Sequence, residues 1–365
     1  MPRMTMVITT INVPVLLEAY QQNFEKYGHL GEADCVVVGD LKTPHEEVRA
    51  VQRKCAEGGF SFSYLHPEVQ EKHIGWSELC LPWNSDCRRN LGYLWAVERG
   101  AEVIVCVDDD NWPGEDDWYA GHALVGQTLP CDTISDQAGW FNPCDLITTQ
   151  HCYARGYPYF RRNQPSGAII GKTLGRVVMN GGMWMNDPDV DSITRLAKSI
   201  STYGLSKDRI MLAPGTWAPV NTQNTAFHKD LLPSFFFPPM GGRICGLPVE
   251  RYGDIWAGYF AQKLMEKMGD SLTFGLPTCI HKRNAHNLLK DLELEFWAIL
   301  LTEQLVEKLR EWPIFSTTYS DGYLELADHL ERAEWKHEHR EQIRAFFGEM
   351  AKAMRRWVGV CRKLA

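Results

Sequence analysis

The sequence lacks the short motifs that identify the commonest nucleotide-binding and thiol-based metal sites. No G-x-G-x-x-G stretch opens a helix and no G-x-x-x-x-G-K-[ST] stretch occurs, which excludes a dinucleotide fingerprint and a P-loop. The 11 cysteines include no C-x-x-C pair, which excludes a zinc ribbon and a thioredoxin-like motif. Any phosphate that the protein binds must therefore be held in another way.

The sequence also lacks a net positive charge and long apolar runs. The formal net charge is -8, and this disfavours nucleic acid as a partner because binding to its backbone needs a basic face. No apolar stretch approaches the roughly 20 residues that span a bilayer, and Met1 to Met4 lead directly into a strand-like segment. Cysteines without a pairing pattern are typical of a reducing compartment. We expect a cytoplasmic protein without a membrane span.

Apolar strands and amphipathic helices alternate in the first third of the 365 residues. The predicted strands cover 4–10, 33–38, 60–65 and 103–107, and the predicted helices cover 14–27, 44–56 and 85–98. This alternation, with short connections, predicts a Rossmann-like, mostly parallel sheet that helices flank on both faces. The expected fold class is α/β.

The rest of the chain is less regular until its last part. Residues 113–165 are rich in glycine, proline, asparagine and aromatic side chains, and are expected to form ordered functional loops. Further predicted elements are a strand at 175–179, a helix from Ser192, a helix at 255–268 and a last strand at 273–280. An apolar stripe from Ile343 to Cys361 predicts a tail helix that packs on the body. We expect a catalytic domain at 1–286 and a C-terminal helical extension at 287–365.

Three carboxylates follow the apolar strand at 103–107. Asp108, Asp109 and Asp110 cannot be buried unpaired, and open α/β sheets bind ligands at the carboxyl ends of their strands. Asp108 and Asp110 would suit Mg²⁺ or Mn²⁺, which complete their shell with water and substrate phosphate. His281 follows the last predicted strand with Lys282 and Arg283 beside it, and could add an imidazole ligand and positive charge. The pattern indicates a metal-bound diphosphate, although loop amides could also satisfy the carboxylates.

Two further groups of charged residues could act on such a ligand. Arg88 and Arg89 could clamp a phosphate in bidentate fashion, or simply lie on a solvated helix face. Cleavage at an anomeric carbon passes through an oxocarbenium-like state that carboxylates stabilise, and Asp189, Asp191 and Asp254 are the candidates. Asp254 could instead be a plain N-cap.

Several longer motifs, taken together, resemble one family. They lie at 85–93 (SDCRRNLGY), 107–110 (VDDD), 155–158 (RGYP), 182–186 (GMWMN), 224–227 (NTAF), 251–258 (RYGDIWAG) and 275–277 (GLP), and His281 follows them. In this order they span about residues 5–300 and resemble the reversibly glycosylated polypeptide family, which comprises the plant UDP-arabinopyranose mutases and their microbial relatives. The helical tail is not covered by these motifs.

The resemblance implies a GT-A-type glycosyltransferase fold that binds a UDP-sugar through a metal at an Asp-x-Asp motif. Its metal ligands match Asp108 and Asp110, and the arginine that carries the reversibly attached sugar in the family matches Arg155. The resemblance also implies that Thr9, Asp40 and Arg89 line the nucleotide pocket, and Arg162 matches a second functional arginine of the family. The other residues expected to bind the nucleotide-sugar are Arg88, Asp109, Arg155, Trp184, Asn224 and Lys282.

The chemistry of arginine favours a different role for Arg155. A guanidinium stays protonated at ordinary pH and has no free lone pair, so it is a poor nucleophile. We therefore favour recognition of the diphosphate or the sugar as its main role.

The leading functional prediction is a metal-dependent glycosyltransferase that uses a UDP-sugar donor and an unknown acceptor. Gly253 stands where the plant proteins have an aspartate, Asp187 replaces an apolar residue and a polar insertion precedes Pro82, and these departures suggest a changed sugar pocket. The alternatives are a UDP-sugar pyranose/furanose mutase with reversible autoglycosylation at arginine, and a non-catalytic UDP-sugar-binding subunit. A phosphohydrolase is disfavoured, because only one strand end is rich in carboxylates and few histidines lie near it for a two-metal site. The sequence is compatible with a monomer or a homo-oligomer.

Overall fold

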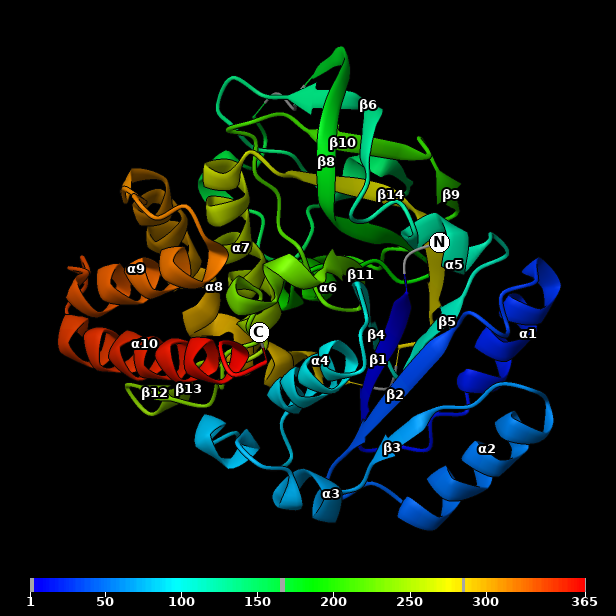
Figure 1. The fold of residues 1–365 in the computed structure, drawn as a ribbon. Coiled ribbons are helices and arrows are strands. Elements are labelled where there is room, and N and C mark those ends of the chain that lie inside the picture. Colours follow the sequence, from blue (N-terminus) through cyan, green and yellow to red (C-terminus); the bar gives the residue numbers. More distant parts are fainter. Residues whose placement is uncertain (1–2, 165–167, 284–285, 365) are drawn as a thin grey trace.

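Four parallel strands form one side of the sheet in the computed structural model, which describes residues 3–164, 168–283 and 286–364. In order across the sheet they are β3 (Ser63–Leu65), β2 (Asp34–Gly39), β1 (Met4–Thr10) and β4 (Val103–Asp108). The helices between them are α1 (Leu17–Tyr27), α2 (His45–Glu57), α3 (Pro67–Lys72) and α4 (Arg89–Glu98). Figure 1 shows α1 and α2 on one side of these strands and α4 on the other. The predicted α/β class with a helix-flanked sheet is confirmed.

Beyond β4 the sheet continues with strands that run largely antiparallel to their neighbours. They are, in order, β11 (Asn224–His228), β8 (Ala168–Met185), β6 (Thr128–Ser135), β10 (Arg209–Leu212), β14 (Ser271–His281) and β5 (Asn111–Pro113). Because β14 also pairs in parallel with β8, the strands β8, β6, β10 and β14 close into a small ring. Short β5 then leads the chain from the end of β4 to the end of β14.

The remaining elements up to residue 281 connect these strands. They are α5 (Trp118–His122), β7 (Ile147–Thr148), α6 (Ser192–Ala197), β9 (Gly204–Leu205), β12 (Arg243–Ile244), β13 (Leu247–Pro248) and α7 (Gly253–Met268), with 3-10 turns η1 (Trp76–Leu79), η2 (Asp86–Arg88), η3 (Pro143–Leu146), η4 (Tyr159–Arg161) and η5 (Lys229–Ser234). The predicted loop region at 113–165 is wrong in one part, since β6 lies inside it. Pro130 inside β6 weakens the apolar alternation that would have predicted a strand.

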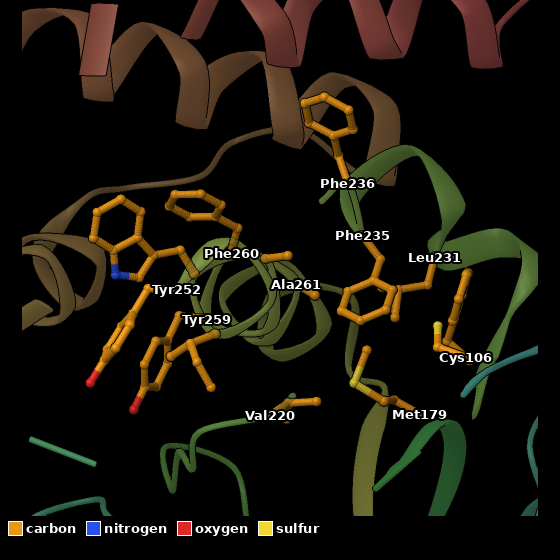
Figure 2. Close-up of a cluster of buried hydrophobic side chains, with 14 of the residues drawn as sticks. Cys106, Met179, Val220, Leu231, Phe235, Phe236, Tyr252, Tyr259, Phe260 and Ala261 are labelled. Atoms are coloured by element: carbon orange, nitrogen blue, oxygen red, sulfur yellow. The ribbon is translucent and has the colours of Figure 1, made fainter. Parts of the chain in front are cut away.

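The β4 strand is buried on both faces, as its apolar sequence predicts. Val103, Val105 and Val107 belong to the core cluster under α1 and α2, whereas Ile104 and Cys106 belong to the larger cluster that reaches α7. Figure 2 shows part of that larger cluster, where side chains from several elements lie around α7, among them Met179, Val220, Phe235, Phe236, Tyr259, Phe260 and Ala261. Burial on both faces holds β4 rigidly, so the carboxylates at its end have a fixed position.

Helix α4 lies unusually close to β1 because Gly92 faces that strand. A Cβ atom at Gly92 would be 2.4 Å from Val7 Cγ1 and 2.9 Å from Val38 Cγ2, so a larger residue does not fit. The close contact places Arg89, one turn earlier on the same helix, beside the end of β4.

Three helices form the C-terminal part: α8 (Leu288–Glu311), α9 (Tyr319–Arg332) and α10 (Arg340–Cys361). The predicted apolar stripe on α10 packs on the body. Trp357 is buried, its ring stacks on Phe236 with 5.1 Å between centroids, and its Nε1 donates to the carbonyl of Leu232 at 3.0 Å. In the part of the chain that the structure describes, no helix combines the length and apolarity needed to cross a membrane.

A buried histidine ties α5 to the sheet and makes stability depend on pH. His122 has no exposed surface, its Nε2 lies 3.1 Å from Asn224 Oδ1 and its Nδ1 lies 3.4 Å from Asn180 Nδ2. Burial lowers the pKa of His122 to about 3. Between about pH 6.5 and pH 3 the unfolded chain therefore binds a proton that the folded chain does not, and stability falls as the pH falls.

We predict that wild-type protein loses about 1 kcal/mol more stability than H122N when the pH falls from 6 to 5. Urea unfolding at each pH measures the difference. H151N, which removes an exposed histidine, serves as the control and is expected to keep the wild-type pH dependence. An equal pH dependence in H122N and wild type would contradict the prediction.

Candidate active site

A polar pocket of about 190 Å³ lies where β4 and β14 end. Arginine, aspartate and histidine side chains line it almost throughout: Arg89, Arg155, Arg195, Arg251, Arg283, Asp86, Asp108, Asp110, Asp189, Asp254, His281 and His286. The register of β5 against β14 explains why two distant segments meet here, because Asn111 pairs with His281 and so places Asp110 beside it. The arginines of the pocket suit an anionic ligand, and its carboxylates suit a cation that binds together with that ligand.

Arg89 and Asp108 form one wall. Arg89 Nη2 donates to Asp108 Oδ1 at 2.7 Å and its Nη1 donates to the carbonyl of Thr222 at 3.1 Å. Burial raises the pKa of Asp108 to about 6, and Arg89 partly offsets this effect. Burial opposes the charge of Arg89, but Asp108 outweighs it and the pKa of Arg89 is raised. The pair leaves one Asp108 oxygen without a bond to Arg89.

His281 is oriented toward Asp110. Its Nδ1 lies 2.8 Å from the carbonyl oxygen of Asp187, which can only accept, so Nδ1 carries the proton. Its Nε2 lies 3.3 Å from Asp110 Oδ2. Burial lowers the pKa of His281, but the hydrogen bond and charge of Asp110 outweigh burial and the pKa is raised.

The donor types at this end of the pocket fit Mn²⁺ or Mg²⁺. Asp108 and Asp110 supply carboxylate oxygens, and His281 is held through its second nitrogen, as is usual for metal-binding histidines. Among residues 3–164, 168–283 and 286–364, however, no three histidine, cysteine, aspartate or glutamate side chains are drawn together tightly enough to enclose an ion. The residue types therefore suit these ions, but the described side chains do not by themselves surround an ion.

At the other end, Arg155 lies between two aspartates. Its Nε donates to Asp189 Oδ1 at 2.9 Å, and its Nη2 donates to Asp189 Oδ2 at 3.0 Å and to Asp254 Oδ2 at 2.7 Å. Its Nη1 donates to Asp254 Oδ1 at 3.0 Å and to the carbonyl of Arg251. Every nitrogen of the guanidinium is therefore engaged, and all three charged side chains are buried.

The charges of this group stabilise one another. Burial opposes the charge of Arg155, but Asp189 and Asp254 outweigh it and raise its pKa. Burial also opposes the charge of Asp189, but Arg155 outweighs it and lowers the pKa of that carboxyl. An arginine in this state is an even poorer nucleophile than a free one. Because its N–H groups all bond protein acceptors, Arg155 holds Asp189 and Asp254 in place, and recognition of a ligand by Arg155 stays a prediction.

Arg251 connects the pocket to α8. It adopts a positive φ of 62°, which is uncommon for a residue with a side chain. Its Nε donates to Glu295 Oε1 at 3.0 Å, and the other Glu295 oxygen accepts from the backbone N–H of Ser192 at 2.8 Å. Asp291, one turn earlier on α8, lies 3.5 Å from Arg251 Nη1. Residues of the predicted helical extension thus help to build the pocket.

Seven of the sequence-predicted site residues line this pocket: Arg89, Asp108, Asp110, Arg155, Asp189, Asp254 and His281. Their roles remain predictions, but the structure brings them together from segments up to 192 residues apart, Arg89 to His281. Asp254 lies in the first turn of α7, whose N-cap is Tyr252, and accepts from Arg155, so the alternative of a plain N-cap is wrong.

Other predicted residues lie outside the pocket lining and bond elsewhere. Arg88 donates to Gln70 Oε1 at 2.6 Å and stacks on the ring of Trp83, Asp40 accepts from the N–H groups of Leu41 and Ser85, and Asp109 accepts from Asn12 at 3.0 Å. Asp191 caps α6 through the N–H of Thr194 and also pairs with Arg162. These contacts support structural roles.

Four more predicted residues are also not part of the lining. Asn224 is fully buried and accepts from Trp118 Nε1 at 3.2 Å, and Trp184 is buried in the core. The Lys282 ammonium lies 3.7 Å from the centre of the Trp112 ring, and the buried Thr9 hydroxyl has no hydrogen-bond partner among the described residues. Their positions do not show contact with a ligand in this pocket.

The sequence did not predict Arg195 and Arg251 as site residues, and it predicted Arg283 only as positive charge beside His281. Arg251 lies in the RYGD motif and Arg283 follows His281, which are the signals that could have found them. Arg195 gives no local signal, because only the fold brings α6 to the pocket. Its Nη1 bonds Asp187, the residue that departs from the family pattern.

The second departure, at Gly253, also affects the pocket. A Cβ atom there would be 2.6 Å from Phe237 Cε1 and 3.3 Å from Met240 Cγ. Phe237 lines the pocket. An aspartate at this position would therefore require Phe237 to move, so the pocket differs in shape from one that has an aspartate here.

The chain is similar in sequence to proteins named UDP-arabinopyranose mutases. "Probable UDP-arabinopyranose mutase 1" of Solanum tuberosum is 25% identical over 357 residues, which are 96% of this chain and 88% of that protein. "UDP-arabinopyranose mutase 3" of Arabidopsis thaliana is 27% identical over 326 residues, which are 88% of this chain and 82% of that protein.

Two solved structures are less similar. Glucosyl-3-phosphoglycerate synthase from Mycobacterium tuberculosis with Mn²⁺ and UDP-glucose gives a TM-score of 0.38 at 11% identity, over 83% of this chain and 79% of that one. S. aureus TarS with UDP-GlcNAc gives a TM-score of 0.42 at 11% identity, over 96% of this chain and 81% of that one. The family described as "Reversibly glycosylated polypeptide" matches residues 3–365. The chain therefore belongs to the reversibly glycosylated polypeptide family.

Proposed function

We propose that this enzyme binds a UDP-sugar in the pocket and breaks the bond between the anomeric carbon and the diphosphate. One observation carries the proposal. A single pocket contains a carboxylate and imidazole group at one end, Asp108, Asp110 and His281, and an arginine held by two aspartates at the other. The first suits the diphosphate with its cation, and the second suits the sugar.

The residues at the diphosphate end offset the charge of the leaving group. When Mn²⁺ or Mg²⁺ is held by Asp108, Asp110 and His281, it supplies positive charge next to the diphosphate. Arg89, which Asp108 and the carbonyl of Thr222 hold in place, adds a fixed guanidinium at the same wall. Arg251 and Arg283 contribute further positive charge.

The carboxylates at the sugar end offset the positive charge that develops on the anomeric carbon. The anomeric carbon becomes positive as the bond to the diphosphate breaks, and a nearby carboxylate stabilises that state. Asp189 and Asp254 are held in place by Arg155, which also keeps Asp189 ionised. Their roles in positioning and charge stabilisation need no nucleophilic arginine.

Isomerisation of the sugar ring is the first candidate outcome. It is supported by the names of relatives that this chain matches over 88–96% of its length, which are UDP-arabinopyranose mutases. Transfer of the sugar to an acceptor is the second candidate, and the changed surroundings of Gly253 and Asp187 favour it. We place the reaction in the cytoplasm, since all 11 cysteines are free thiols.

Incubation with single UDP-sugars and Mn²⁺, followed by chromatography of the nucleotide sugars, tests the proposal. A ring-isomerised UDP-sugar without an acceptor supports the mutase. Release of UDP only when an acceptor extract is added supports the transferase and overturns the mutase. Binding of UDP-sugar without turnover under both conditions would indicate a binding subunit, and no binding at all would refute the proposal.

A further inference from the structure

A second cavity adjoins the proposed active site. It has a volume of about 250 Å³, and Arg195 and Arg283 line both this cavity and the first pocket. The side chains that line only the second cavity include Lys198, Ser199 and Ser201. Two guanidinium groups therefore stand at the boundary between two adjoining spaces.

Cations outnumber carboxylates in this cavity. Arg195, Lys198 and Arg283 line it together with one carboxylate, Asp187. The whole chain has a formal net charge of -8, so a local excess of positive charge is contrary to its overall balance. Such an excess is what an anionic ligand requires.

The two arginines are held in place and keep donors available. Arg195 donates through Nη1 to Asp187 Oδ1, through Nη2 to the carbonyl of Pro188 at 2.8 Å and through Nε to the carbonyl of Val190 at 3.2 Å, which leaves one N–H on each Nη nitrogen. Arg283 Nη2 donates to Asp291 Oδ2 at 3.0 Å, and this is its only hydrogen bond to the described residues. A fixed guanidinium with free N–H groups can bind a phosphate in bidentate fashion.

The wall of the cavity is also tied to the end of β14. Asn186 has a positive φ of 75°, and its side chain donates to the carbonyl of His281 at 3.1 Å. The next residue, Asp187, contacts both His281 through its carbonyl and Arg195 through its carboxylate. The same turn therefore orients a residue of the first pocket and a residue of the second cavity.

We propose that the second cavity binds the phosphate group of a second substrate, a phosphate monoester. Its phosphate would lie between Arg195, Arg283 and Lys198, with the hydroxyl groups of Ser199 and Ser201 as further donors, and the rest of the molecule would reach the first pocket. A phosphate carries close to two negative charges at neutral pH and three acceptor oxygens, which matches this group of donors better than a carboxylate does. The proposal rests on the proposed binding of UDP-sugar in the first pocket and would make transfer the outcome.

Calorimetric titration with inorganic phosphate, in the presence of saturating UDP and Mn²⁺, tests the site. Wild-type protein is expected to bind one phosphate while UDP stays bound. R283Q is expected to weaken phosphate binding about 10-fold or more, because a hydrogen-bonded charge is lost, and K198Q is expected to weaken it several-fold. R49Q removes an exposed arginine of α2 that pairs with Glu46 and is expected to bind phosphate as wild type does.

Each outcome decides the proposal. Absence of phosphate binding, competition between phosphate and UDP, or unchanged affinity in both K198Q and R283Q would overturn it. Tighter binding of acetate than of phosphate would overturn the choice of a phosphate monoester. Thermal unfolding checks that R283Q is folded, and the exposed position of Lys198 makes K198Q a second, independent variant. If UDP does not bind but phosphate binds and responds to both variants, the proposed function fails and the phosphate site stands.

Discussion

Replacement of Arg155 by methionine is expected to lower the free energy of unfolding by about 3–5 kcal/mol and to abolish turnover. The substitution leaves Asp189 and Asp254 as buried carboxylates without their cation, which costs far more than loss of a surface ion pair. Urea unfolding measures the stability, and conversion of UDP-sugar measures the activity.

Two further variants test whether the loss of stability comes from the unpaired buried carboxylates. In R155M/D189N/D254N no charge remains unpaired, so the triple variant is expected to be more stable than R155M but still inactive. R355M removes an arginine that pairs with two exposed carboxylates, Asp328 and Glu331, and it should cost no more than about 1 kcal/mol. A loss of less than 1 kcal/mol in R155M would contradict the buried ion network.

Intact-protein mass spectrometry after incubation with UDP-sugar tests the same arginine chemically. Because every nitrogen of Arg155 is engaged and its pKa is raised, we expect no pentose or hexose on this residue. A sugar adduct that is present in wild type and absent in R155M, with R155M shown to be folded, would instead support reversible glycosylation at Arg155.

Replacement of Asp110 by asparagine is expected to weaken the Mn²⁺-dependent binding of UDP by at least about 10- to 100-fold, the loss that changes in outer-shell partners already cause. The amide removes a negative charge and one oxygen donor beside His281. Calorimetric titration with UDP, once with Mn²⁺ and once with EDTA, measures the effect. The loss should appear only when Mn²⁺ is present.

The neighbouring carboxylate provides the control. Asp109 bonds Thr10 and Asn12 and does not line the pocket, so D109N is expected to bind UDP nearly as wild type does. If D109N and D110N lose affinity equally, or if wild-type binding is the same with Mn²⁺ and EDTA, the assignment of Asp110 to the metal is wrong.

Local sequence patterns predicted much of the framework. The β1 strand has the bounds that its apolar residues predict, and the end of β4 places Asp108 at a pocket as expected. The stripe on α10 packs on the body because apolar residues at three- and four-residue spacing must be buried somewhere. Strand β6 was missed, since a proline and polar residues interrupt its pattern.

The partners of the charged residues could not be read in the same way. Asp108, Asp109 and Asp191 were all plausible site residues by sequence, but Asp109 bonds Thr10 at the end of β1 and Asp191 caps α6. A carboxylate bonds whichever donor the fold brings to it, and short motifs do not contain that information.

The sequence by itself determined the alternation of strands and helices, the acidic end of β4 and the family, because each of these depends on residues close together or on several motifs in a fixed order. Only the tertiary structure decided that Arg155 joins Asp189, 34 residues away, to Asp254, 99 residues away, and that α8 holds Arg251. Buried ion pairs need an oppositely charged group within a few ångströms, and only the folded chain determines which group that is.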